Sequence, residues 1–161
     1  MPKPLPNFNR MLTLIDEVFD TRSDPDQLQV NEQVLKKLEK IHPACLSEHA
    51  DENGPLIWVL IIPTTQIVMD NFLSGKISEK DIVAKTEPGE KYTCIYLCSV
   101  TTLPEYRGKG NSKKLCLNAI QAIRKDNPIE TLFVWPFTKE GEQLAQSLAK
   151  ECKLPLKTFC K

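Results

Sequence analysis

The sequence lacks three features that would place it in large classes of protein. No stretch approaches the roughly 20 consecutive apolar residues of a transmembrane helix. Residues 1–6 have no apolar core of the kind found in a signal peptide. Lysine and arginine together number 21, as do aspartate and glutamate, so no general excess of positive charge points to nucleic acid. We therefore expect a cytoplasmic protein with no membrane or nucleic-acid partner.

The sequence also lacks the residue spacing of a structural metal site. It has two histidines, His42 and His49, and no second Cys or His pair accompanies Cys94 and Cys98. Without a secretory signal, the cysteines are expected to stay reduced and to pack mostly as small apolar residues. They are Cys45, Cys94, Cys98, Cys116, Cys152 and Cys160. We expect no metal, and we expect both histidines to be solvated around the polar, turn-rich segment 43–54.

What is present is typical of one α/β (α+β) domain. The 161 residues, 1–161, can bury a sizeable core, and no repeat or change of composition marks a second domain. Apolar residues at helical spacing predict helices at about 7–20, 31–41, 110–126 and 139–152, and two shorter helices within 64–84. Short runs rich in β-branched residues predict strands at 56–62, 92–102 and 129–134, and a short strand at 157–160. Pro63 is expected to end the first strand, and Thr64 or Thr65 to cap the next helix.

A basic, glycine-containing turn separates the predicted strand 92–102 from the predicted helix 110–126. It reads Thr-Thr-Leu-Pro-Glu-Tyr-Arg-Gly-Lys-Gly-Asn-Ser-Lys-Lys over residues 101–114. The unpaired N–H groups of a helix's first turn favour an anion, and glycines let the backbone approach it closely. The spacing does not match a Walker A loop, and Lys113 stands where a dinucleotide fingerprint requires a third glycine. A protein-kinase glycine loop would require a much longer chain.

The charges of this turn indicate a small polyanionic ligand. Arg107, Lys109, Lys113 and Lys114 are cationic, and no acidic residue occurs between positions 106 and 125. Lys113 and Lys114 fall in the first turn of the predicted helix, where a cation opposes the helix dipole by about 0.3–1 kcal/mol. The alternative interpretation is an ordinary strand-to-helix turn with solvated lysines. The unfavourable placement of the two lysines favours a bound anion.

Residues 104–112, Pro-Glu-Tyr-Arg-Gly-Lys-Gly-Asn-Ser, resemble the acetyl-CoA signature of the GCN5-related N-acetyltransferase (GNAT) superfamily, [Gln/Arg]-x-x-Gly-x-[Gly/Ala]. Arg107 to Ser112 fill its six positions, with Ser112 in place of the last small residue. The order strand, signature, helix, strand, helix over about residues 91–150 is also similar to that family.

The resemblance implies a central, mixed and mostly antiparallel sheet flanked by helices, whose fourth and fifth strands splay apart to admit the pantetheine arm. It implies a transferase that moves an acetyl group from acetyl-CoA to an amine of unknown identity by direct attack, without a metal. The backbone of the strand before the signature would pair with pantetheine, and the turn would hold the pyrophosphate. The corresponding residues are Val100, Thr101, Thr102, Arg107, Gly108, Lys109, Gly110, Asn111 and Ser112.

The catalytic residues are unassigned, because the sequence departs from the family where its catalytic groups often lie. The strand 92–102 has no Asp or Glu, the helix 139–152 has no tyrosine, and Thr138 stands near the place of the usual Asn. Glu87, Glu90 and Ser147 are expected at the surface, and Tyr96 and Cys98 in the core. These departures motivate an alternative function, a non-catalytic acyl-CoA-binding module with a regulatory or interaction role.

Two further departures concern shape. Helices occupy residues 64–84, where relatives often have a hairpin, and Ile67, Met69, Phe72 and Leu73 could form a groove or lid there. At helical spacing such residues are usually core. Only nine residues follow Cys152, which leaves little room for the family's last two strands. An unpaired sheet edge favours association, so a homodimer is a possible assembly.

Overall fold

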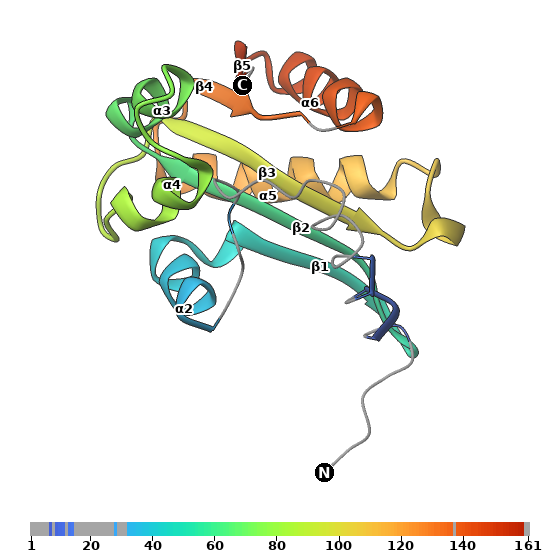
Figure 1. The fold of residues 1–161 in the computed structure, drawn as a ribbon. Helices are drawn as coiled ribbons and strands as arrows, with labels where there is room; N and C mark the ends of the chain where they lie inside the picture. Colours follow the sequence, from blue (N-terminus) through green and yellow to red (C-terminus); the bar gives the residue numbers. More distant parts are fainter. Residues whose placement is uncertain are drawn as a thin grey trace.

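The computed structural model describes residues 7, 9–11, 13–14, 28, 32–136 and 138–159. At its centre is an open five-stranded sheet with the order β1-β2-β3-β4-β5 (Figure 1). The strands are β1 (Leu46–Asp51), β2 (Gly54–Thr64), β3 (Cys94–Thr102), β4 (Thr131–Val134) and β5 (Leu156–Thr158). β1, β2 and β3 pair antiparallel, whereas β3, β4 and β5 pair parallel. The expected mixed sheet is confirmed. Two of the four strand pairings are antiparallel and two are parallel, whereas a mostly antiparallel sheet was expected.

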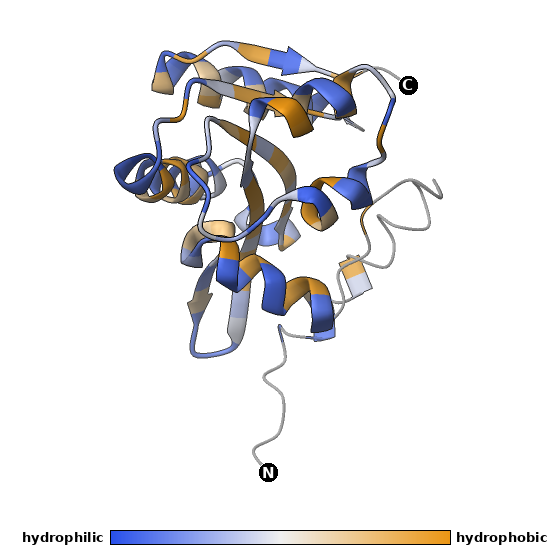
Figure 2. Ribbon diagram, turned by 90° about the vertical axis from the view of Figure 1, so that its left-hand side faces the viewer, coloured by the Kyte–Doolittle hydropathy of each residue, from blue (hydrophilic) through white to orange (hydrophobic). Residues whose placement is uncertain are grey.

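Helices cover both faces of this sheet. They are α2 (Glu32–Ile41), α3 (Gln66–Leu73), α4 (Glu79–Lys85), α5 (Asn111–Asp126) and α6 (Lys139–Cys152), with short 3-10 turns η1 (Pro43–Cys45) and η2 (Pro104–Tyr106). α5 and α6 connect the parallel strands and pack against each other. α2 and α4 lie in front of the sheet in Figure 1, and α5 passes behind it. Figure 2 shows apolar strands at the centre and helices of mixed hydropathy around them.

The chain before α2 is described in part. Residues 7, 9–11, 13 and 14 are helical, and we call them the N-terminal segment. They agree with the helix predicted at 7–20, of which residues 8, 12 and 15–20 lie outside the described residues. Met11 is fully buried, and the N–H of Asn7 donates to the carbonyl of Asn53 in the β1–β2 turn, with an N···O distance of 3.0 Å. The segment is therefore docked onto the sheet.

The helical insertion before β3 contributes to the core. Thr65, not Thr64, caps α3 through its side chain, and Ser78 is the N-cap residue of α4. Phe72 packs against an aromatic cluster on the α3 face of the sheet, with ring centroids 4.6–6.3 Å away. Its neighbours there are Tyr96, Phe133, Trp135 and Phe159. This packing explains why most apolar residues of the insertion are buried, although Ile67 is 74% exposed.

Two predictions about the region before β3 were wrong. The segment 43–54 contains η1 and the edge strand β1, not only loop. β1 is exposed along almost its whole length, so it lacks the apolar alternation that identifies a half-buried strand. β2 also runs past Pro63, which pairs with Ile95 near the end of the strand. The missing N–H of a proline is tolerated best at a strand end.

His42 is buried rather than solvated, which corrects a further prediction. Its Nδ1 accepts the N–H of Ala44 at 3.0 Å, so its Nε2–H donates to Oδ2 of Asp126 at 2.7 Å. The imidazole thereby connects η1 to the C-terminal end of α5. His49 is exposed, as expected, but lies in β1 rather than in a loop.

Four of the cysteines are buried, as the sequence predicted. These are Cys45, Cys94, Cys116 and Cys152, whereas Cys98 is half-buried and Cys160 lies outside the described residues. Within the described part of the chain, none of the helices combines the length and hydrophobicity that crossing a membrane requires.

Candidate functional site

The site begins where strands β3 and β4 separate. They pair from Cys94 and Thr131 to Leu97 and Val134, where β4 ends. β3 continues to Thr102, and beyond Leu97 it pairs with β2 alone among the described strands. Over residues 98–102, no described strand therefore covers the edge of β3 that faces α6.

A β-bulge lies at the point of separation. Leu97 pairs with Ile61 and Ser99 pairs with Leu60, so Cys98 is the extra residue on β3. Bulges bend and twist a strand locally and are frequent next to functional sites. The bulge coincides with the last β3–β4 pair, so the bend occurs where β3 leaves β4.

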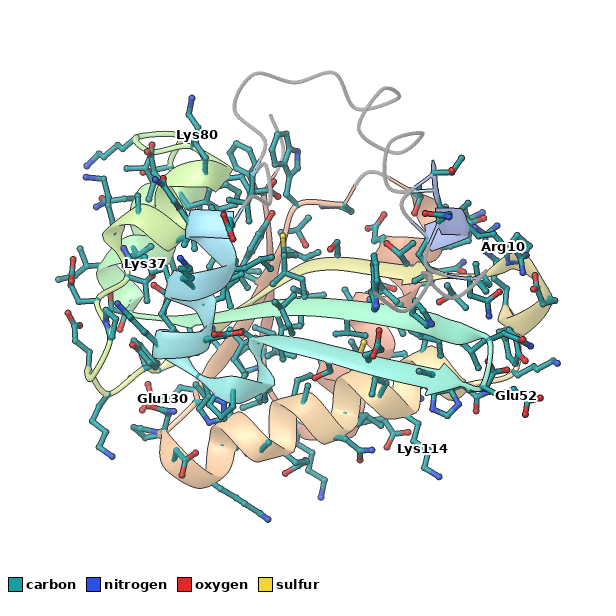
Figure 3. All side chains as sticks on the ribbon, turned by 90° about the horizontal axis from the view of Figure 1, so that it is seen from below. Arg10, Lys37, Glu52, Lys80, Lys114 and Glu130 are labelled. Atoms are coloured by element: carbon teal, nitrogen blue, oxygen red, sulfur yellow. The ribbon has the colours of Figure 1, made fainter. Side chains whose placement is uncertain are left out.

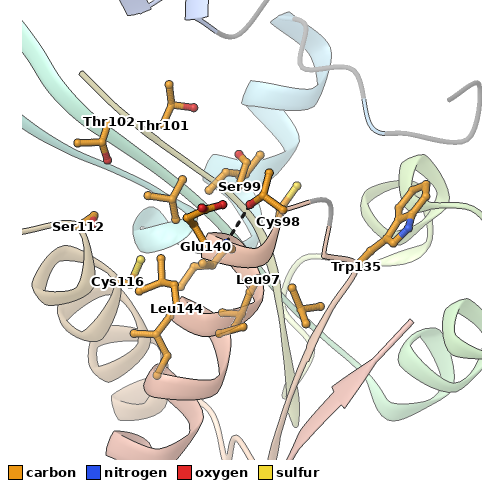
Figure 4. A pocket seen from close by; sticks show the side chains of 18 of the residues that line it. Leu97, Cys98, Ser99, Thr101, Thr102, Ser112, Cys116, Trp135, Glu140 and Leu144 are labelled. Atoms are coloured by element: carbon orange, nitrogen blue, oxygen red, sulfur yellow. Dashed lines mark hydrogen bonds between the residues drawn. The ribbon is translucent and has the colours of Figure 1, made fainter. Parts of the chain in front are cut away.

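A cavity of about 730 Å³ occupies this separation, within the roughly 300–1,000 Å³ usual for small-molecule sites. Figure 4 shows β3 along one wall, Ser112 and Cys116 of α5 at one end, and Trp135 at the other. α6 supplies the facing wall through Glu140, Gly141, Leu144, Ala145 and Leu148. The N-terminal segment contributes Leu14.

The cavity is lined from both faces of the sheet. Side chains alternate along a strand, so Leu60 of β2 and its partner Ser99 lie on the face of α3 and α4. Ile61 and its partner Leu97 lie on the opposite face, against α5. All four line the cavity. A ligand in the cavity can therefore contact side chains of both faces of the sheet.

The turn before α5 leaves several backbone N–H groups without a partner among the described residues. Gly108 and Gly110 have φ values of +78° and +75°, a conformation that L residues with a Cβ rarely adopt. Gly110 is the N-cap residue and no side chain caps α5. Among the described groups, none accepts a hydrogen bond from the backbone N–H of residues 108–112. These donors are free for a ligand.

The positive charge of the turn is partly compensated, which the sequence did not reveal. Lys113 forms an ion pair with Glu151 of α6, with 3.2 Å between Nζ and Oε1. Lys109 lies over the ring of Tyr106, 5.1 Å from its centroid. Lys114 extends from α5 away from the sheet (Figure 3). Arg107 and the backbone donors, rather than four unpaired cations, are therefore the main groups here that could attract an anion.

Arg107 is the cation that lines the cavity. Its Nε–H donates to the carbonyl of Thr102 at 3.2 Å, which orients the guanidinium beside the end of β3. Its two terminal nitrogens have no acceptor among the described residues. They can therefore donate to an anion at the turn.

The predicted cofactor-binding residues fall into two groups in the structure. Val100, Thr101, Thr102, Arg107 and Ser112 line the cavity, residues 108–110 form an exposed turn before α5, and Asn111 is the half-buried first residue of α5. The expectations for surface residues agree with the structure for Glu87 and Glu90, which are exposed and do not line the cavity. Cys98 is half-buried: it packs against the core and also lines the cavity. Tyr96 is fully buried, and its hydroxyl donates a hydrogen bond to the carboxylate of Glu79 in α4. It is therefore a core residue, as expected.

Sequence reasoning missed Glu140, which is an exposed residue in the first turn of α6 and lines the cavity. Thr138 caps α6 by accepting the N–H of Gly141 at 2.9 Å, and it lines the cavity as well. In the sequence, Thr138 indicates where α6 begins, because threonine is a common N-cap residue. Nothing in the sequence shows that the start of α6 faces β3.

The thiols around the site have different chemical character. Burial raises the pKa of Cys116 to about 12, so this cavity-lining thiol stays protonated and is a poor nucleophile at neutral pH. Burial likewise raises the pKa of Cys45 to about 12. Cys98 is half-buried and lines the cavity from the bulge, where a reagent can reach it.

An ion pair connects the N-terminal segment to the turn that precedes the glycines. Both terminal nitrogens of Arg10 contact Glu105 of η2, at 2.6 and 2.7 Å. The hydrogen bond from Arg10 lowers the pKa of Glu105 to about 2. This contact joins the N-terminal segment, which contributes Leu14 to the cavity, to η2, which directly precedes the glycine turn.

Comparison with known proteins gives no match: no protein-family model, curated protein or solved structure is significantly similar to the chain. Within the described residues, no group of three His, Cys, Asp or Glu side chains could hold a metal ion.

Proposed function

We propose that the protein is an acetyl-CoA-dependent N-acetyltransferase of the GCN5-related type. The observation that carries this proposal is the row of unpaired N–H groups at residues 108–112 beside Arg107, at the end of a cavity between diverging parallel strands. The pyrophosphate of acetyl-CoA can accept hydrogen bonds from these donors. Its narrow, acylated pantetheine arm can lie along the uncovered edge of β3. The residues present therefore suit the group that the signature implies.

The roles of the residues follow from their positions. Residues 108–112 and Arg107 would hold the pyrophosphate. The backbone of residues 100–102 would pair with the pantetheine amides, because this edge of β3 has no strand beside it. Acetyl-CoA supplies the acetyl group as a thioester. The protein would then contribute chiefly proximity, since it would hold two reactants in one cavity that is lined from both faces of the sheet.

Titration calorimetry with acetyl-CoA, coenzyme A and inorganic pyrophosphate tests the proposal. Arg107→Glu removes a charge-assisted hydrogen bond worth about 1.5–3 kcal/mol, so we expect the affinity for coenzyme A to fall roughly 10- to 100-fold. Lys125→Glu is the matched control, since it makes the same charge change at the exposed, C-terminal end of α5. Absence of binding at near-millimolar coenzyme A, or equal losses in both variants, would contradict the proposal.

A non-catalytic acyl-CoA-binding module is the second candidate. It is favoured by the composition of the cavity, whose described lining includes no tyrosine and no histidine to serve as acid or base. Release of the coenzyme A thiol over a broad panel of amines separates the two functions. Turnover with any amine excludes the non-catalytic module, whereas tight binding without turnover favours it.

A further inference from the structure

Glu140 lines the cavity but has no role in the proposed binding of the cofactor. It is the one acidic residue among the described residues that line the cavity. In Figure 4 its carboxylate points from the start of α6 toward β3 near Ser99. Within the described part of the chain, the ion pairs join Arg10 to Glu105 and Lys113 to Glu151, and the imidazole of His42 hydrogen-bonds to Asp126, so none of these contacts neutralises Glu140.

The charges that line the cavity are separated. Arg107 and the start of α5 provide positive potential at the end where Ser112 lies, and Glu140 provides the negative group on the α6 wall. An anion and a cation can thus be bound together, each near a group of opposite sign. The anionic end is the one assigned above to the pyrophosphate, which leaves Glu140 for a cation.

The rest of the lining limits what else this cation can carry. On the α3 face of the sheet, the cavity is lined by Leu60 and by the hydroxyl-bearing residues Ser99 and Thr101. Leu14 of the N-terminal segment lines it as well. A single carboxylate can neutralise one ammonium group. A second ammonium would be placed against apolar side chains without a counter-charge, which is unfavourable.

We propose that Glu140 binds the ammonium group of the acceptor, and that the acceptor is a monoamine with an apolar body. This inference rests on the proposed function, because it takes the opposite end of the cavity to be occupied by coenzyme A. It makes Glu140 a specificity-determining residue: the carboxylate selects cationic acceptors and holds the nitrogen within the cavity.

Binding of simple probes tests the assignment without a known substrate. Ligand-detected NMR would compare hexylamine, which is protonated at neutral pH, with hexanol, its neutral counterpart, and with spermidine, in the presence of coenzyme A. For the unmodified protein we expect hexylammonium to bind about fivefold more tightly than hexanol, the upper range for one solvent-accessible charge pair. We expect spermidine to bind no more tightly than hexylammonium.

Glu140→Gln should abolish the preference for hexylammonium over hexanol. Glu142→Gln is the matched control, because Glu142 is exposed in the same first turn of α6 and does not line the cavity, so both variants change the helix dipole equally. The assignment is overturned if Glu140→Gln keeps the preference, or if Glu142→Gln loses it as well. Tighter binding of spermidine would overturn the monoamine class.

A separate titration with coenzyme A distinguishes failure of this inference from failure of the proposed function. We expect Glu140→Gln to bind coenzyme A as the unmodified protein does. If the unmodified protein fails to bind coenzyme A, the proposed function is wrong, and the same probe comparison made without coenzyme A still reports on Glu140. If coenzyme A binds but no ammonium preference is found, only the role of Glu140 is wrong.

Discussion

At the scale of single residues, Arg10 and Glu105 connect two parts of the chain that are distant in sequence. Both side chains are about half exposed, so the pair is screened by solvent and contributes modestly to overall stability. Its consequence is local, because it fixes the N-terminal segment against η2, directly before the glycine turn.

The pKa of Glu105 provides a measurement of this contact. The hydrogen bond from Arg10 lowers that pKa from its ordinary value of 4.5 to about 2. A lowered pKa in the folded state means that the pair stabilises the fold above about pH 4.5, and that this contribution is lost as the pH falls toward 2. In Arg10→Ala we expect the pKa of Glu105 to rise toward its ordinary value in a carbon-detected NMR titration, while a backbone hydrogen bond and the charge of Lys109 continue to lower it. An unchanged midpoint in Arg10→Ala would show that the ion pair does not form in solution.

At the scale of elements, the end of β3 and the start of α5 were predictable, whereas the edge strand was not. Residues 92–102 and 110–126 have clear periodicities, and the structure places β3 and α5 there. β1 has no apolar alternation because it is exposed at the sheet edge. The ion pair of Lys113 with Glu151 and the burial of His42 depend on contacts between distant helices, which local patterns do not encode.

The bulge in β3 leads to a prediction about thiol reactivity. Cys98 lines the cavity at the bulge and should react with a thiol reagent near neutral pH, whereas Cys116 should not, because its pKa is about 12. Saturating acetyl-CoA, whose thiol is blocked as a thioester and does not consume the reagent, should slow the labelling of Cys98 by covering the uncovered edge of β3. Mass spectrometry of the labelled peptides would measure both rates. Labelling of Cys98 at the same rate with and without acetyl-CoA would place the ligand elsewhere.

At the scale of the whole molecule, a neutral net charge coexists with a cavity that has one cationic and one acidic side chain among its described lining residues. Equal numbers of acidic and basic residues give no general attraction for polyanions, so the proposed binding of coenzyme A depends on the donors of residues 108–112 and on Arg107. Glu140 reaches this cavity because the β3–α5–β4–α6 connection brings the start of α6 opposite β3, a relation that no residue spacing reveals. The sheet ends in two edge strands, β1 and β5, and a homodimer through either edge stays a proposal.

The central claim is that coenzyme A lies between β3 and α6 with its pyrophosphate on the glycine turn, and amide NMR shifts on titration test it most directly. We predict the largest shifts at residues 108–112, with further shifts along 99–102 and none in β1. Pantetheine, which lacks the pyrophosphate, should shift 99–102 and leave 108–112 almost unchanged. Shifts that concentrate away from the turn, or an identical pattern for both ligands, would contradict the claim.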